Sequence, residues 1–228
     1  MTGDGAAGRR LLLDQFLPEY DLSIVHADVF RAPPAECYEA ALEMDLFRAP
    51  LARALLGLRA LPERVADTVR GRGRTPGATD ARGTFRLKDM VGLGWILLGE
   101  TPGAEMALGQ VSRPWKSVAA SADVPTTPEQ FAGFSQPGYA KIVAGLRIDP
   151  YGTGSSIMTV ETRVAIRDEK SRRRFRRYWA LVGPFSSLIR RMALRQLAHE
   201  LRGGLSRRRR RGRRPLPARL PSCRTAAP

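Results

Sequence analysis

The chain has 228 residues, of which 43% are hydrophobic and 26% charged, which is enough apolar content for the core of one domain. Its formal net charge is +16, but the segment from Arg202 to Pro228 holds ten arginines and no acidic residue. That tail carries +10, so the other 201 residues carry only 16 − 10 = +6. The overall charge therefore argues for a nucleic-acid partner mainly through the tail.

Two cysteines and two histidines limit the chemistry that the chain can carry. Cys37 is predicted in a helix and Cys223 in the tail, so we expect no disulfide and a reducing compartment. His26 and His199 show no metal-ligand spacing, so we expect neither a metal nor a cofactor. The apolar runs are shorter than a signal-peptide core or a membrane span, and a cytoplasmic location is expected.

Composition divides the chain into three parts. We predict a flexible N-terminus over residues 1–20, a folded domain over 21–201 and a disordered Arg/Pro-rich tail over 202–228. The first strand is predicted over 21–31, where β-branched residues precede Pro33-Pro34.

Helices and a loop are predicted next. Pro33-Pro34 and Glu36 suit a helix N-terminus, and an apolar stripe from Tyr38 onward continues that helix. A second helix is predicted over 50–61, and a solvated Gly/Arg loop over 70–83.

Five strand-like segments follow, with turn signals and no helix between most of them, which is typical of an antiparallel sheet. They cover residues 84–89, 94–99, 105–111, 140–148 and 156–167. In the last two, apolar side chains alternate with charged ones, so one face is predicted wet and the other to face a core or cavity. The apolar face carries Ile142, Ala144, Leu146 and Ile148 on one strand, and Met158, Val160, Thr162, Val164 and Ile166 on the next.

A long amphipathic helix is predicted from Asp168, after an irregular segment at 112–138 with a short helix near Thr127. Pro184 should kink the long helix, and Gly203-Gly204 should end it. Its polar face is predicted to carry the arginines at 172, 173, 174, 176, 177, 190, 191 and 195. The predicted fold class is therefore α+β.

Two segments carry a family resemblance. The strand followed by Arg31-Ala32-Pro33-Pro34-Ala35-Glu36-Cys37-Tyr38 is similar to the opening of the START-like, or SRPBCC, superfamily, also called polyketide cyclase/dehydrase-like or Bet v 1-like. The ending, with Glu161-Thr162-Arg163 on a strand and then Arg173 to Trp179 and Val182 to Arg191, resembles actinobacterial-type members. The resemblance spans about 21–201 and implies a helix-grip fold, in which a curved antiparallel sheet wraps around the long C-terminal helix.

The resemblance also implies an apolar cavity between sheet and helix, which in family members holds lipids, polyketides or similar compounds. The expected partner is thus an apolar small molecule. The same side chains could instead fill a solid core. The expected ligand-binding residues are Trp95, Leu97, Met106, Leu108, Ile142, Leu146, Met158, Val160, Phe175, Trp179, Val182 and Phe185.

Polar candidates are few. His26 could act as a general base with Asp28, two residues away on the same strand face, as its orienting partner, although a structural role is the simpler interpretation. Glu161 with Arg163 and Arg147 is predicted to form an ion-pair cluster on the outer face.

Three functions remain open at this stage. The chain could bind an apolar small molecule, or catalyse a cyclase or dehydratase reaction on the same fold. Alternatively, its basic tail and helix arginines could make weak, nonspecific contacts with nucleic acid or an anionic membrane surface. No aromatic residue interleaves the tail arginines, which weakens the nucleic-acid hypothesis.

Overall fold

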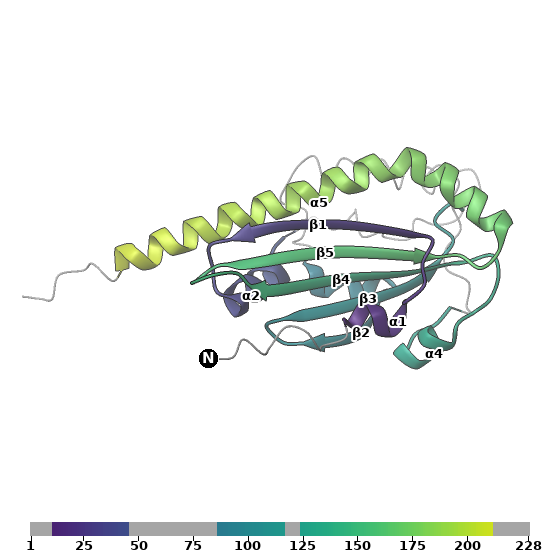
Figure 1. Ribbon diagram of the computed structural model, residues 1–228, viewed down its shortest axis with the longest axis horizontal. Helices are drawn as coiled ribbons and strands as arrows, with labels where there is room; N and C mark the ends of the chain where they lie inside the picture. The colour runs from purple at the N-terminus through teal and green to yellow at the C-terminus, as the bar shows by residue number, and fades with distance from the viewer. Residues whose placement is uncertain (1–10, 46–85, 117–123, 212–228) are drawn as a thin grey trace, which may run out of the picture.

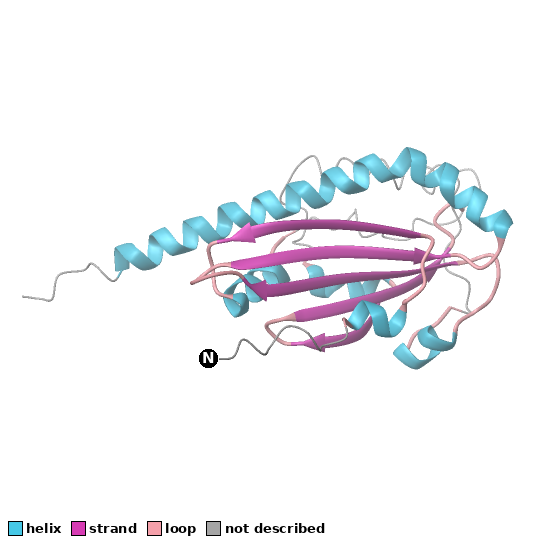
Figure 2. Cartoon of the chain, viewed as in Figure 1, coloured by secondary structure: helices cyan, strands magenta, loops and turns pink. Residues whose placement is uncertain are grey.

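The computed structural model describes residues 11–45, 86–116 and 124–211 (Figures 1 and 2). These residues form an α+β fold, as expected. In chain order the elements are α1 (Leu12–Phe16), β1 (Leu22–Phe30), α2 (Pro34–Glu43), the 3₁₀ helix η1 (Leu87–Leu93), β2 (Ile96–Thr101), β3 (Glu105–Ser112), α4 (Pro128–Gly133), β4 (Ala140–Pro150), β5 (Ser156–Ala165) and α5 (Glu169–Arg211).

The five described strands form one antiparallel sheet in the order β1-β5-β4-β3-β2, which is open because β1 and β2 are its edges. Val160 on β5 pairs with His26 on β1 and with Leu146 on β4, so these three side chains lie on the same face. We call this the inner face, and the opposite one the outer face. The predicted side of each β4 and β5 residue is confirmed, but the outer face is not wet as predicted, because Val143 is 0% and Arg163 6% exposed.

The inner face packs against α2 and the C-terminal half of α5. Tyr38 and Cys37 of α2, and Leu194 and Leu197 of α5, share one buried cluster with strand residues such as Met158. The C-terminal half of α5 therefore adheres to the sheet through leucines at helical spacing. Figure 1 shows α5 running along the sheet beside β1 and curving at its N-terminal end.

The outer face packs against α1, so residues 11–20 of the segment predicted as flexible are folded, and residues 1–10 lie outside the described residues. Leu13 of α1 is buried together with Val143 of β4 and Ala107 of β3. Gly145 lies beneath Leu13, because a Cβ atom at Gly145 would come within 2.0 Å of the Leu13 Cδ1 atom. A glycine in the middle of β4 is thus what allows α1 to approach the sheet.

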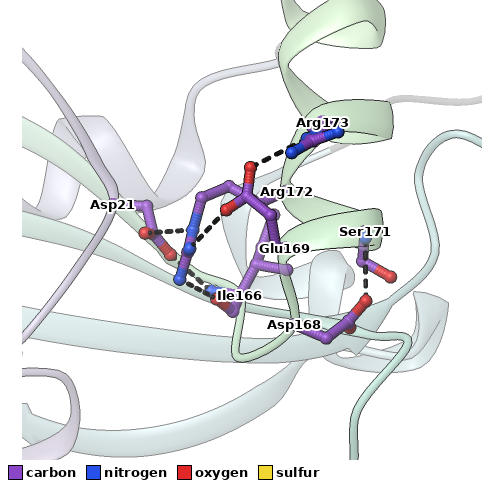
Figure 3. A network of polar contacts seen from close by, with 7 residues as sticks. All are labelled: Asp21, Ile166, Asp168, Glu169, Ser171, Arg172 and Arg173. Carbon is purple, nitrogen blue, oxygen red and sulfur yellow. Dashed lines mark hydrogen bonds and ion pairs between the residues drawn. The ribbon is translucent and has the colours of Figure 1, made fainter.

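Polar contacts fix the start of α5 (Figure 3). The carboxylate of Asp168 accepts hydrogen bonds from the backbone N–H of Ser171 at 2.8 Å and of Gly138 at 2.6 Å. These bonds lower the pKa of the Asp168 carboxyl. One turn later, Arg172 forms an ion pair with Asp21, just before β1, at 2.8 Å. The predicted helix start at Asp168 is confirmed.

Several other expectations differ from the structure. Of the segment predicted as a strand over 84–89, the described residues 86–89 instead begin η1, whose first turn is closed by the Asp89 carboxylate accepting the Arg86 N–H at 2.8 Å. Gly203-Gly204 does not end α5, which continues to Arg211. The predicted helix over 50–61 and the loop over 70–83 lie outside the described residues. In the part of the chain that is described, every helix is too short or too polar to cross a membrane.

Candidate functional site

Part of the inner face is only half-covered. Met158 and Phe30, towards one end of the sheet, are 2% exposed, and Val164, towards the other end, is also 2% exposed. Between them the apolar residues Ile24, Ala144 and Val160 are only half-buried. Their cross-strand partners on the same face are buried, namely Leu108, Leu146 and Thr162. This central region, bounded by β1, β5, β4 and the middle of α5, is the candidate site.

Arg190 extends from α5 towards this region. Its guanidinium donates to the Thr162 hydroxyl of β5 at 3.0 Å and to the Ser186 hydroxyl, one helical turn earlier, at 3.0 Å. Thr162 is 6% exposed and lies on the inner face opposite Ile24 and Ala144. Burial lowers the pKa of Arg190, and among the described residues no carboxylate contacts it.

His26 lies on the same face, on β1. Burial, and then the positive charges of Arg190 and Arg191, lower the pKa of its imidazole, so His26 is neutral at neutral pH. Its Nδ1 atom is buried and has no hydrogen-bond partner among the described residues. Asp28 does not accept a hydrogen bond from this Nδ1 atom, and its carboxylate accepts the Val29 N–H at 2.8 Å instead.

The predicted ligand-binding residues fall into three groups. The first group belongs to the inner-face cluster with α2 and α5. Two of its predicted residues, Trp95 and Val160, are partly buried. The fully buried members of this group are Met106, Leu108, Leu146 and Met158. These four residues fill the core, which extends to the half-buried residues, because Leu146 pairs with Val160 and Leu108 pairs with Ala144.

A second group gathers at the N-terminal end of α5. Phe175 and Trp179 are stacked with ring centroids 5.9 Å apart, and Ile142 packs against the same cluster. Trp115 meets Phe175 edge-on at 6.3 Å, so aromatic rings close this end of the inner face.

The third group is exposed or half-exposed. Leu97 on β2 is 39% exposed, Phe185 is 41% exposed, and Val182 is half-buried. Phe185 was expected on the inner side of α5, but it lies on the side of the helix that also carries the exposed Leu181 and Leu188. The apolar stripe of α5 is wider than the surface that the sheet covers, so its sequence alone did not separate inner from outer residues.

Sequence analysis did not single out Arg190, Thr162 and Ser186 as a group. Arg190 was assigned to the polar face of α5, yet it lies seven residues before Leu197 and eleven after Trp179, both of which face the sheet. Those intervals are whole helical turns, so the helical phase was the signal that could have found it.

A network of ions covers the outer face. Arg163, only 8% exposed, donates to Glu161 at 2.7 Å and to Asp14 of α1 at 2.6 Å. The prediction of an Arg163–Glu161 contact is confirmed, but Arg147 pairs instead with Asp149 at 2.7 Å. A hollow of about 140 Å³ beside this network is lined by both acidic and basic side chains, which partly neutralise one another. The network attaches α1 to the sheet.

Comparison with known proteins adds no assignment: no family model, curated protein or solved structure matches the chain. In the described parts of the chain, no three His, Cys, Asp or Glu side chains gather closely enough to hold a metal ion. The chemistry of the site must therefore be argued from its own groups, which are a cation, two hydroxyls and a neutral imidazole next to apolar side chains.

Proposed function

We propose that the chain binds an apolar small molecule between the inner face of the sheet and α5, in a helix-grip arrangement. The observation that carries this proposal is the group of half-buried apolar residues Ile24, Ala144 and Val160 on the inner face, next to Thr162, which Arg190 of α5 contacts. Apolar surface left partly uncovered under a long helix is the kind of surface that ligand sites use. The resemblance to the START-like superfamily supports the same function.

The polar groups favour binding over catalysis. His26 is neutral and could accept a proton, but it faces two arginines and, among the described side chains, Nδ1 has no hydrogen-bond partner to orient it. A cyclase or dehydratase role would need such a group aligned with the substrate.

The test is a titration of an environment-sensitive apolar dye, followed by comparison of two phenylalanine variants. Val160→Phe fills the centre of the inner face, whereas Val25→Phe adds the same ring on the outer face, where Val25 is 55% exposed. If Val160→Phe displaces two buried methylenes of the ligand at about 0.8 kcal/mol each, binding weakens about tenfold. Equal dye binding by wild type and both variants would contradict the proposal.

A second candidate function is docking of α5 on an anionic membrane surface. Leu181 is 71% exposed, and Phe185 and Leu188 are each 41% exposed. Lys170, Arg174 and Arg177 precede these three at steps of three and four residues, so all six lie along one side of the helix. Among the described residues, no acidic side chain pairs with these three cations. Exposed apolar residues next to cations favour a lipid surface over nucleic acid, because acyl chains can cover them.

Vesicle sedimentation tests this second function. The chain should bind vesicles that contain phosphatidylserine and not vesicles of phosphatidylcholine alone, since each cation near an anionic surface contributes about 1 kcal/mol. Leu181→Asp should abolish binding, whereas Tyr151→Asp, at a position in the β4–β5 loop that is also exposed, should not. Binding that Leu181→Asp leaves unchanged, or that duplex DNA displaces from the vesicles completely, would refute docking through this side of α5.

A further inference from the structure

The polar group around Arg190 is rich in donors. A guanidinium has five N–H donors, and two of those in Arg190 are used by Thr162 and Ser186, so three remain. Because both hydroxyl oxygens accept from Arg190, each hydroxyl still has its own hydrogen to donate. In the part of the chain that is described, no carboxylate or backbone carbonyl accepts any of these donors.

This arrangement is unfavourable for the protein alone. Moving a positive charge out of water costs hydration free energy, and hydrogen bonds to neutral hydroxyls offset only part of that cost. Two other arginines that are at least half-buried, Arg163 and Arg172, have carboxylate partners: Arg163 contacts Glu161 and Asp14, and Arg172 contacts Asp21. Arg190 differs from them in that only hydroxyls contact it.

The position of Arg190 places its donors next to apolar surface. Thr162 pairs with Ile24 on β1 and with Ala144 on β4, both half-buried and apolar, and Val160 is the next inner-face residue along β5. The unused donors of Arg190 thus lie at the border of the less covered apolar surface. A molecule with an apolar body on that surface would bring a polar end group to Arg190.

We propose that Arg190, assisted by Thr162 and Ser186, binds the carboxylate of an amphipathic acid whose apolar body lies on the centre of the inner face. This inference rests on the proposed function and names the class of ligand. A planar carboxylate accepts two parallel N–H bonds from one guanidinium.

A single negative charge balances Arg190. A phosphate monoester carries up to about two charges at neutral pH and would need a second cation. His26 does not supply one, because its imidazole is neutral there, and Arg191 is exposed. The site is therefore better matched to a carboxylate than to a phosphate.

Three probes of equal chain length test the end group in the full chain: dodecanoate, dodecanol and dodecyl phosphate, each titrated by displacement of the apolar dye. Dodecanoate should bind about 10 to 100 times more tightly than dodecanol, the range expected for charge-assisted hydrogen bonds over neutral ones. Dodecyl phosphate should bind less tightly than dodecanoate. Equal affinities for acid and alcohol would overturn the inference.

Variants test whether Arg190 causes the preference for acid over alcohol. Arg190→Leu should bind acid and alcohol equally, and Thr162→Val, which keeps the shape of the side chain, should reduce the preference severalfold. Arg191→Leu removes the exposed neighbouring charge and should leave the preference unchanged. If Arg191→Leu reduces it as much as Arg190→Leu does, the acid is attracted by the general charge of α5 and the assignment to Arg190 is wrong.

The two proposals fail in different ways. If none of the three probes displaces the dye, or the dye itself does not bind, the proposed ligand site is wrong and the inference falls with it. If alcohol and acid both bind and Arg190→Leu changes neither, the apolar site stands and only the carboxylate assignment fails. A thermal melt of each variant shows that it is folded, and the comparison of acid with alcohol on the wild type needs no variant.

Discussion

A single added methyl group should displace α1 from the sheet. In Gly145→Ala, the new Cβ atom would lie 2.0 Å from Leu13 Cδ1, 3.0 Å from Leu13 Cγ and 3.2 Å from Leu13 Cδ2. Carbon atoms pack at about 3.5 to 4.0 Å, so Leu13 must change its rotamer or α1 must move. Overpacking of this kind costs about 1 to 3 kcal/mol of folding free energy.

Chemical denaturation of the full chain measures this cost. Gly133→Ala is the matched control, because a Cβ atom at Gly133 in α4 would meet no atom within 4 Å. That substitution should be neutral or stabilising by up to about 1 kcal/mol, since alanine favours helix more than glycine does.

A double-mutant comparison identifies the partner. Leu13→Ala removes the clashing atoms and, because Leu13 is 4% exposed, should itself destabilise the fold by about 2 to 5 kcal/mol. On that background Gly145→Ala should have almost no further effect. If Gly145→Ala costs the same with Leu13 present as with Leu13→Ala, the described packing of α1 on the outer face is refuted.

Three more outcomes are expected. Arg163→Leu should destabilise the fold by about 2 kcal/mol in denaturant titration, because the half-buried Glu161 loses its charged donor, and a neutral effect would contradict this. Because the pKa of His26 is lowered in the fold, the unfolded chain binds more protons than the folded one below pH ~6.5. The free energy of unfolding should therefore decrease as the pH is lowered through this range. His26→Asn should flatten that dependence in thermal melts, and an unchanged slope would refute it. Burial raises the pKa of Cys37 to about 11, so in a Cys223→Ser background a thiol reagent at neutral pH should label Cys37 only after denaturation.

Regular local patterns were predictable from the sequence. The side of the sheet taken by each residue of β4 and β5, the helix that begins at Pro34, and the short helix near Thr127 depend on neighbouring residues, and the structure confirms them. Such elements carry their own signal, because a strand with one apolar face reads the same in any fold.

Elements stabilised by distant contacts were not predictable. The five-residue helix α1 is too short to be stable alone and depends on Leu13 packing above Gly145 and on Asp14 contacting Arg163, some 150 residues away. The 3₁₀ helix η1 was missed for a different reason: its Asp89–Arg86 contact is local, but it is a weaker signal than the strand-like composition around it.

The candidate site was predicted only in part. Val160 and Ala144 were expected on the inner face and lie there, because strand alternation fixes their side. Arg190 was not expected there, because an arginine in a helix rich in arginines gives no compositional signal, and only its phase relative to Leu197 places it. Phe185 was expected to face the sheet and is exposed, because the apolar stripe of α5 is wider than the part of the helix that the sheet covers.

Native mass spectrometry of the full chain, purified from the cells that naturally make it, tests the central claim most directly. The account predicts one bound amphipathic acid per chain, released on unfolding and identified in negative-ion mode, with loss of the bound mass in Val160→Phe but not in Val25→Phe. A chain that carries no ligand, gains none when incubated with dodecanoate, and binds no apolar dye would contradict the claim that the inner face and α5 enclose a ligand site.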